Sequence, residues 1–251
     1  MITEAAVIPG ELIDKLADSR KIVFFTGSGV SAESGIPTFR GDDGLWKKFS
    51  AQELANFDSF MRNPDMVWEW YQYRRRIIHD SEPNAGHRAI VDFEKYFDVT
   101  VITQNVDDLH HRAGSSHVLE LHGNITRNKC TQCGEIFTGE VRLEDRKPPR
   151  CACGALIRPD VVWFGENLPE GVYEKAEESC EACDMMFVVG TSGVVYPAAL
   201  LPSAALSSGA IVVDVNIDEE DHQHNRRFFL KGRSGDVLPA LFERVKILKE
   251  Y

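Results

Sequence analysis

Short runs of apolar residues recur along the chain, and most of them are separated by longer stretches with helical or polar character. The runs cover residues 22–25, 99–102, 118–121, 185–189 and 211–215. Continuous apolar runs of this length are typical of strands buried on both faces, and their alternation with helices indicates a parallel sheet. The pattern therefore predicts an α/β fold.

Two regions interrupt this alternation. Residues 38–85 are rich in tryptophan and helix-like, and residues 127–156 contain several cysteines and two adjacent prolines. We expect these regions to be a helical insert and a second insert that together form a smaller lobe. The main sheet domain would then comprise residues 1–37, 86–126 and 157–251.

A glycine-rich turn follows the first apolar run, where residues 27–40 read GSGVSAESGIPTFR. Gly27 and Gly29 allow the backbone to turn tightly beside a pyrophosphate, and Ala32 takes the place of the third small residue of a dinucleotide fingerprint. A glycine turn at a strand end often binds nothing, so this motif needs support from elsewhere. With a parallel sheet around it, the motif predicts a turn that binds phosphate.

Polar and small residues follow the other runs too. The second run leads into TQNVDDLH from position 103, the third into His122 and Gly123, the fourth into GTSG from position 190, and the fifth into Asn216 and Asp218. Ligands of such sheets bind at the carboxyl ends of the strands, where small residues admit phosphates and Asn or Asp can bond ribose hydroxyls. These strand ends predict a nucleotide site.

His122 is the candidate general base, because an imidazole titrates near neutral pH. A lone histidine at a strand end is more often a packed or capping residue. The polar company of Asn105 and Asp107 favours catalysis here. The other histidines near these strand ends lack such company and are expected to be structural or solvent-facing: His110, His111 and His117.

The chain has 6 cysteines, in three close pairs. Cys130 and Cys133, followed by Cys151 and Cys153, have a glycine after each pair and resemble two zinc knuckles, although the second pair is tighter than usual. Four thiolates would close a tetrahedral structural zinc site. Cys180 and Cys183 lie in a helix-like stretch without turn residues and are expected to be helix thiols.

Composition narrows the function classes. A chain of 251 residues with 43% hydrophobic content can bury a sizeable core, and its net charge of -11 disfavours binding to nucleic acid or to anionic membranes. A lysine-rich protein segment remains a compatible partner. The first residues show no secretory signal, and no apolar run reaches the ~18 residues of a membrane span. We expect a cytoplasmic protein.

Jointly, these stretches resemble the sirtuins, the NAD-dependent protein lysine deacylases, over nearly the whole length. The matching motifs are the stretch from position 27, TQNVDDLH, the HG at His122, the two cysteine pairs, VVWFGE from position 161, GTS and NID. Ser28 departs from the family pattern, which usually has alanine. The resemblance implies a cleft between a Rossmann-like domain and a lobe with helices and one structural Zn2+, entered by NAD as co-substrate and by acyl-lysine segments of proteins.

The resemblance also implies a mechanism. The acyl oxygen attacks the nicotinamide ribose, nicotinamide leaves, and His122 deprotonates a ribose hydroxyl, so that free lysine and O-acyl-ADP-ribose are produced. Asn105 would order the ribose side or a water, and Asp107 would hold the carboxamide. Residues implied to bind NAD are Gly27, Ser28, Gly29, Ser31, Phe39, Arg40, Gln104, Asn105, Asp107, Gly190, Thr191, Ser192, Asn216, Asp218 and Ser234. Residues implied to sandwich the substrate peptide are Val161, Phe164, Gly165, Glu166, Val194 and Tyr196.

One helical face indicates which acyl group is removed. Val67, Tyr71, Arg74 and Ile78 share a face, on which an arginine without an acidic partner would cost stability. A ligand carboxylate would supply that partner, with Tyr71 and Arg74 gripping the end of a succinyl or malonyl chain. The YxxR pattern is similar to that of the class III, desuccinylating sirtuins. The alternative is that Arg74 belongs to a solvated basic run with the two arginines that follow.

Two other functions stay open at this point. A protein ADP-ribosyltransferase would cleave the same glycosidic bond but leave ADP-ribose on the acceptor. A non-catalytic NAD or zinc-binding module would have no need of a base, so His122, Asn105 and Asp107 together argue against it. The second insert carries several acidic residues and no basic stripe, which disfavours nucleic-acid binding by the zinc lobe.

Overall fold

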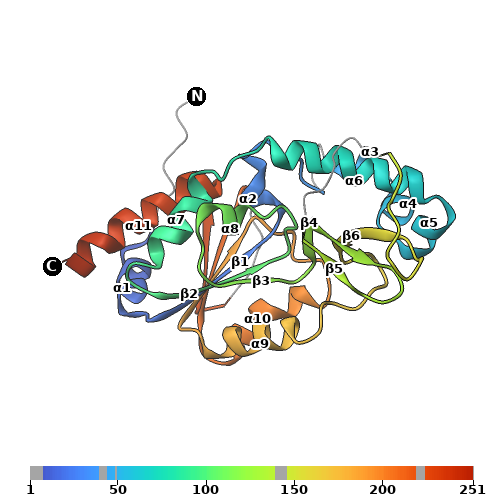
Figure 1. Ribbon diagram of the computed structural model, residues 1–251. Helices are drawn as coiled ribbons and strands as arrows, with labels where there is room; N and C mark the ends of the chain where they lie inside the picture. Colours follow the sequence, from blue (N-terminus) through green and yellow to red (C-terminus); the bar gives the residue numbers. More distant parts are fainter. Residues whose placement is uncertain (1–7, 40–43, 49, 139–145, 219–223, 251) are drawn as a thin grey trace.

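The computed structural model describes residues 8–39, 44–48, 50–138, 146–218 and 224–250. They form a large domain around a 6-stranded sheet of order β3-β2-β1-β7-β8-β9 and a small lobe that contains a 3-stranded sheet of order β5-β4-β6 (Figure 1). Every pairing in the large sheet is parallel and every pairing in the small sheet is antiparallel. The α/β fold with a smaller lobe is confirmed.

The large sheet contains all the predicted runs. Its strands are β1 (Lys21–Thr26), β2 (Asp98–Thr103), β3 (Val118–Glu120), β7 (Met185–Val189), β8 (Ile211–Asn216) and β9 (Arg227–Lys231). The pattern missed only β9 in this sheet. This edge strand buries Leu230 alone, and its Arg227 is paired with Asp214 of β8, so it has no continuous apolar run.

Helices cover both faces of the sheet. One face packs against α1 (Gly10–Asp18), α7 (Ala85–Phe93) and α11 (Ser234–Glu250), and the other against α9 (Val172–Ala182) and α10 (Leu201–Ser207), which follows the short η1 (Ala198–Leu200). In the first layer, Phe24 stacks on Phe187 at 5.0 Å between ring centroids and meets Phe93 edge-on at 5.3 Å. Two further helices are short: α2 (Ser28–Ala32) follows β1, and α8 (Leu109–Ala113) follows the loop after β2.

The helical insert consists of α3 (Leu45–Lys48), α4 (Ala51–Leu54), α5 (Phe57–Arg62) and the long α6 (Pro64–His79). Asn63 caps α6 by accepting a hydrogen bond from Met66 N, and Pro64 occupies its first position, where a missing N–H costs nothing. The face of α6 that was predicted to be apolar is buried against α5 and the small sheet.

The solvated basic run was a wrong alternative for Arg74. Arg74 and Arg75 are buried, and only Arg76 of the three arginines is exposed. The guanidinium of Arg75 donates to the backbone oxygen of Ile125 at 2.7 Å and to Asn128 Oδ1 at 2.6 Å, which fastens α6 to the small sheet. The two neighbouring arginines therefore have different surroundings, because they point to different sides of one helix.

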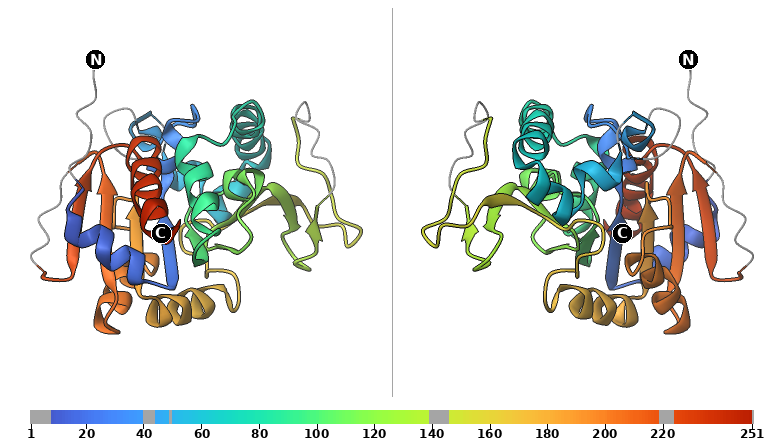
Figure 2. Two further views of the ribbon diagram at one scale, coloured as in Figure 1. Left: turned by 90° about the vertical axis from the view of Figure 1, so that its left-hand side faces the viewer. Right: turned by 90° about the vertical axis from the view of Figure 1, so that its right-hand side faces the viewer.

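The small sheet comprises β4 (Gly123–Cys130), β5 (Ile136–Phe137) and β6 (Ile157–Val161). Its strands extend past both ends of the predicted insert at 127–156, because the cysteine motif marks only the far end of this sheet. Figure 2 shows the sheet projecting to one side of the large domain. No helix in the described ranges is long and apolar enough to cross a membrane.

Candidate active site and metal centre

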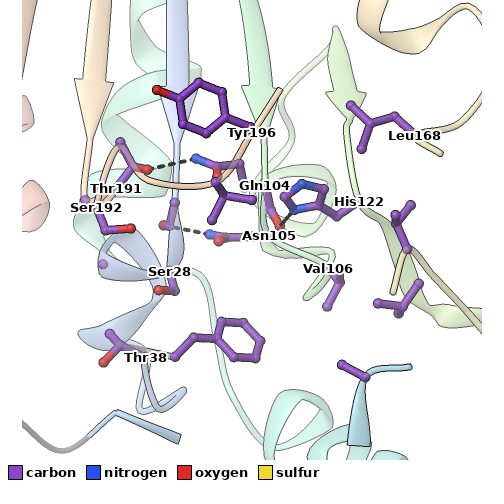
Figure 3. Close-up of a pocket in the computed structure, with 18 of the residues that line it drawn as sticks. Ser28, Thr38, Gln104, Asn105, Val106, His122, Leu168, Thr191, Ser192 and Tyr196 are labelled. Atoms are coloured by element: carbon purple, nitrogen blue, oxygen red, sulfur yellow. Dashed lines mark hydrogen bonds between the residues drawn. The ribbon is translucent and has the colours of Figure 1, made fainter. Parts of the chain in front are cut away.

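A cavity of about 1050 Å³ opens at the carboxyl ends of the large sheet, where the two lobes meet. The turns after β1, β2, β7 and β8 contribute to its wall, and so do α6 and the segment after β6. Its volume lies just above the ~300–1,000 Å³ that is usual for ligand sites. Figure 3 shows that the side chains of several of these turns converge.

The glycines of the first turn are required by close backbone packing. Gly29 N donates to the backbone oxygen of Gly190 at 2.8 Å. A Cβ on Gly27 would lie 2.8 Å from Gly190 O, and a Cβ on Gly29 would lie 2.7 Å from Gly190 Cα. The residue after β7 thus fixes one side of the glycine turn, and the other side of the turn faces the cavity. This open backbone cradle fits the pyrophosphate of a dinucleotide.

Gln104 and Asn105 join the strand ends to one another (Figure 3). Gln104 Nε2 donates to Thr191 Oγ1 at 2.9 Å, and Asn105 Nδ2 donates to the backbone oxygen of Gly27 at 3.0 Å. The two side chains therefore hold the turns after β1, β2 and β7 in one arrangement, and both line the cavity.

Asp107 lies behind the cavity wall. Its carboxylate accepts hydrogen bonds from Ser31 Oγ at 2.7 Å and from Leu109 N at 3.0 Å, and Ser31 Oγ in turn accepts one from Asn105 Nδ2 at 3.2 Å. Burial raises the pKa of Asp107, and these two bonds oppose the rise. Ser31 and Asp107, both predicted at the site, support Asn105 from behind and do not line the cavity themselves.

The ring of His122 has a defined tautomer. Its Nδ1 lies 3.0 Å from the backbone oxygen of Gln104. A carbonyl oxygen can only accept, so Nδ1 donates and Nε2 of the neutral ring carries the free lone pair. Burial lowers the pKa of His122, which keeps the ring neutral near pH 7. His122 lines the cavity and has the properties of a general base.

Tyr71 and Arg74 reach the same cavity from α6, although they are only 1% and 7% exposed. The guanidinium carbon of Arg74 lies 4.8 Å from the ring centroid of Phe39 and 5.0 Å from that of Trp70. Burial lowers the pKa of Arg74, whereas the charge of Asp107 raises it. The sequence suggested no acid near this arginine. That expectation was incomplete, because Asp107 comes from the loop after β2.

The expected peptide-binding residues lie on two sides of the opening. Val161, Phe164, Gly165 and Glu166 line the cavity from the small-lobe side, and the exposed Tyr196 lines it from the other. Val194 is exposed but is not part of the wall. The carboxylate of Glu166 is held by Arg158, which makes this acid part of the scaffold.

The remaining residues predicted to bind NAD all line the cavity, except for one that the structure does not describe. Arg40 lies outside the described residues. The others line the cavity: Ser28, Phe39, Gly190, Thr191, Ser192, Asn216, Asp218 and Ser234.

Sequence reasoning missed the role of Glu33. Its carboxylate accepts hydrogen bonds from Gly235 N at 2.8 Å and from Ser234 Oγ at 3.2 Å, which connects α2 to the start of α11. Glu33 is visible inside the fingerprint, but its partners are some two hundred residues away and no spacing rule points to them.

The predicted cysteine cluster is assembled at the far end of the small sheet. Cys130 Sγ lies 3.5 Å from Cys153 Sγ, and Cys133 Sγ lies 3.7 Å from Cys151 Sγ. A tetrahedral site with Zn–S bonds of about 2.3 Å requires sulfur atoms about 3.8 Å apart, so the four thiols fit zinc. The backbone N–H groups of Cys133 and Gln132 lower the pKa of Cys130 to about 6, which favours the thiolate that zinc needs.

Cys180 and Cys183 take no part in that cluster. They are buried at the end of α9 and pack against the large sheet. Burial raises the pKa of Cys183 to about 12, so it is an inert thiol. The prediction of two helix-associated thiols holds.

Comparison with known proteins agrees with this geometry. The model of the Sir2 family matches residues 27–197. The chain is 50% identical over 244 residues to an NAD-dependent protein deacylase of Pyrococcus furiosus, covering 94% of this chain and 98% of that protein. It is 45% identical over 235 residues to an NAD-dependent protein deacylase of Mycobacterium tuberculosis, covering 91% and 99%.

Solved structures give the same result. A Sir2 homologue in complex with NAD superposes with a TM-score of 0.88 at 40% identity, covering 98% of this chain and 96% of that one. A complex of Sir2 with a p53 peptide and NAD+ superposes with a TM-score of 0.84 at 34% identity, covering 95% and 98%. NAD and a structural zinc ion are accordingly the cofactors of this chain, which belongs to the Sir2 family of NAD-dependent protein lysine deacylases.

Proposed function

We propose that this deacylase removes succinyl and malonyl groups from protein lysines as well as acetyl groups, and that it prefers the acidic acyl groups. The observation that carries the proposal is the pair of Tyr71 and Arg74 on the cavity wall. An acetyl group ends in a methyl and offers nothing to a guanidinium. A dicarboxylic acyl group ends in a carboxylate, which arginine binds with two parallel hydrogen bonds.

The surroundings of Arg74 support a carboxylate ligand. The side chain is enclosed by the rings of Phe39, Trp70 and Tyr71, whose centroids lie 4.8, 5.0 and 5.7 Å from its guanidinium carbon. Aromatic faces attract the cation but cannot replace the hydrogen bonds that it loses on leaving water. Asp107 compensates part of the charge from one side, and an acyl carboxylate entering the cavity would add a second anion.

His122 is proposed as the base of the reaction. Its Nδ1 is occupied by Gln104 O, so only Nε2 is available to take a proton from a ribose hydroxyl. When bound, NAD supplies a leaving group, nicotinamide, and a ribose that accepts the acyl group. The products would be nicotinamide, free lysine and O-acyl-ADP-ribose.

Asn105 and Gln104 are proposed to order the ribose side of the site. Their amide nitrogens are already committed to Gly27 O and Thr191 Oγ1, which fixes both side chains before any ligand enters. Asp107 would act on this region through Ser31 and Asn105. The direct contact between Asp107 and the nicotinamide carboxamide that the family resemblance implies would require the cavity wall to open at this point.

The substrate peptide is proposed to lie between residues 161–166 and 194–196 as an added strand. Phe164 and Tyr196 are 47% and 72% exposed, which suits side chains that are covered when a peptide binds. The net charge of -11 favours lysine-rich segments. Cysteines arranged as a metal cluster are typical of a reducing compartment, so we expect the enzyme in the cytoplasm.

Matched peptides that carry acetyl-lysine or succinyl-lysine at one position test the proposal. The value of kcat/KM would be measured for each with saturating NAD, following the freed lysine peptide by mass. We expect higher kcat/KM on the succinyl peptide. A preference for acetyl would refute the acyl assignment and leave the deacylase intact. Release of nicotinamide without freed lysine would indicate transfer of ADP-ribose instead.

A further inference from the structure

The hydroxyl oxygen of Tyr71 has two donors beside it, the indole of Trp163 and the guanidinium of Arg74. Trp163 Nε1 lies 2.7 Å from the Tyr71 oxygen, and both side chains are almost completely buried. An indole N–H can only donate, so the phenol oxygen is the acceptor in this bond and its own proton must point elsewhere. None of the described residues accepts that proton. Burial raises the pKa of Tyr71, so the hydroxyl keeps its proton at neutral pH.

Trp163 is itself held firmly. Its backbone N–H donates to Glu166 Oε2 at 2.8 Å, and its ring lies under the guanidinium of Arg158, whose carbon is 3.2 Å from the ring centroid. Arg158 is 2% exposed, forms an ion pair with Glu166 and donates to the backbone oxygen of Val161 at 2.6 Å. The indole therefore has little freedom to turn away from Tyr71.

The hydrogen-bond network around Trp163 contains a buried charge, the guanidinium of Arg158. Removing the Arg158 charge from water costs free energy that its ion pair with the partly exposed Glu166 need not repay, and Arg158 Nε has no hydrogen-bond partner among the described residues. Apolar residues of similar size would often be as stable at such a place. What the charged group adds here is orientation: it fixes the Trp163 ring and, through it, the position of the Tyr71 oxygen.

We propose that Trp163 is a positioning residue for acyl specificity: its indole N–H occupies the oxygen of Tyr71, so that the tyrosine proton is presented to the carboxylate at the end of the acyl chain, beside Arg74. This inference rests on the proposed preference for acidic acyl groups. Tyr71 and Arg74 then offer two donors to one carboxylate. Without the indole N–H, Arg74 alone would hold the phenol oxygen, and the hydroxyl hydrogen could turn about the C–O bond away from the carboxylate.

The test compares Trp163→Phe, Tyr71→Phe and the double variant. The readout is the ratio of kcat/KM for succinyl-lysine and acetyl-lysine peptides of one sequence. We expect Trp163→Phe to lower the ratio about tenfold, as loss of one hydrogen bond to a charged group does. The double variant should be no less selective than Tyr71→Phe alone, because both changes remove the same donor. Trp68→Phe, which also alters a buried tryptophan of this lobe, should keep the wild-type ratio.

A second readout does not depend on activity. In 15N-labelled protein, the indole resonance of Trp163 is identified by its absence in Trp163→Phe. Tyr71→Phe should shift this resonance and speed its exchange with solvent, because the indole N–H loses its acceptor.

Different results would overturn different conclusions. A wild-type enzyme that does not prefer succinyl would overturn the acyl assignment together with this inference. A selective wild type would leave the acyl assignment standing. In that case the role of Trp163 is refuted if Trp163→Phe lowers kcat/KM equally on both peptides, if the losses of the two single variants add up in the double variant, or if Tyr71→Phe leaves the indole resonance unchanged.

Discussion

The Nδ1 atom of His122 lies 3.0 Å from the backbone oxygen of Gln104, and this bond determines which nitrogen of the ring can act as a base. Gln104 also bonds Thr191 through its side chain at 2.9 Å. One residue therefore sets the tautomer of the base and joins the strand ends around the nucleotide site.

Replacing His122 with alanine should stop turnover and leave the fold intact. The change removes the base and no zinc ligand, and loss of a general base typically lowers the rate about 10²–10⁴-fold. Turnover of an acyl-lysine peptide and the midpoint of thermal unfolding would be measured together. His117→Ala, at an exposed position, is the matched control. Substantial turnover by His122→Ala would contradict the assignment.

The pH dependence of kcat/KM should show a descending acid limb from His122. Burial lowers its pKa below the ordinary value of about 6.5, so the ring remains an available base to lower pH than a free histidine would. Activity is then full above this lowered pKa and falls as the pH drops through it. An acid limb centred above about pH 7 would indicate a different base or a changed environment.

His87 should make stability depend on pH. Burial lowers the pKa of His87 to about 4, while the unfolded chain titrates near the ordinary value of about 6.5. The unfolded state then binds the proton first as pH falls. Stability is complete above about pH 6.5 and falls towards pH 4, by about 2 kcal/mol at pH 5. Urea unfolding at pH 7 and pH 5 would measure it, and His87→Gln should lose less stability between these pH values than the wild type.

Replacing Arg74 with methionine should weaken removal of succinyl much more than removal of acetyl. Methionine keeps much of the side-chain length but cannot bind a carboxylate, and hydrogen bonds to charged groups contribute about 1.5–3 kcal/mol, or roughly 10–100-fold in kcat/KM. Steady-state kinetics on the matched peptides would measure the change. Arg76→Met removes an exposed charge from the same helix as a control. Equal losses on both peptides would exclude the carboxylate clamp.

Replacing Cys130 with serine should release zinc and unfold the end of the small lobe, because a structural zinc ion contributes directly to folding. A strong chelator should have the same effect on the wild type. Bound zinc by metal analysis and limited proteolysis would be measured on both. Cys180→Ala, which changes a buried thiol outside the cluster, should retain zinc. Retained stoichiometric zinc in Cys130→Ser would show that Cys130 is not a ligand.

The sequence predicts those parts of this protein that are encoded by residues close together in the chain. Continuous apolar runs identify the central strands, since these are buried on both faces, and the glycine turn and the cysteine spacing identify their sites. The edge strand β9 was missed because most of its side chains stay partly exposed.

Contacts between distant segments could not be predicted in this way. Trp163 and Tyr71 are 92 residues apart, and neither belongs to a motif that names the other. Asp107 was expected on the cavity wall because its position in the TQNVDDLH motif implies a contact with the carboxamide, but only the three residues before it line the cavity. Only the packing of Ser31 over its carboxylate determines that Asp107 lies behind the wall.

Strand β4 begins directly after His122, the proposed base, and strand β6 ends beside it. Val162 N donates to the backbone oxygen of His122 at 2.9 Å, and Ile125 N donates to that of Val106 at 2.8 Å. His122 therefore lies at the root of the small lobe, where the lobe joins the large domain. If the lobe rotates about this root when a peptide enters, the zinc end moves furthest, the peptide-binding segment less, and the base least. Substrate could thus be admitted and released without moving the group that transfers the proton.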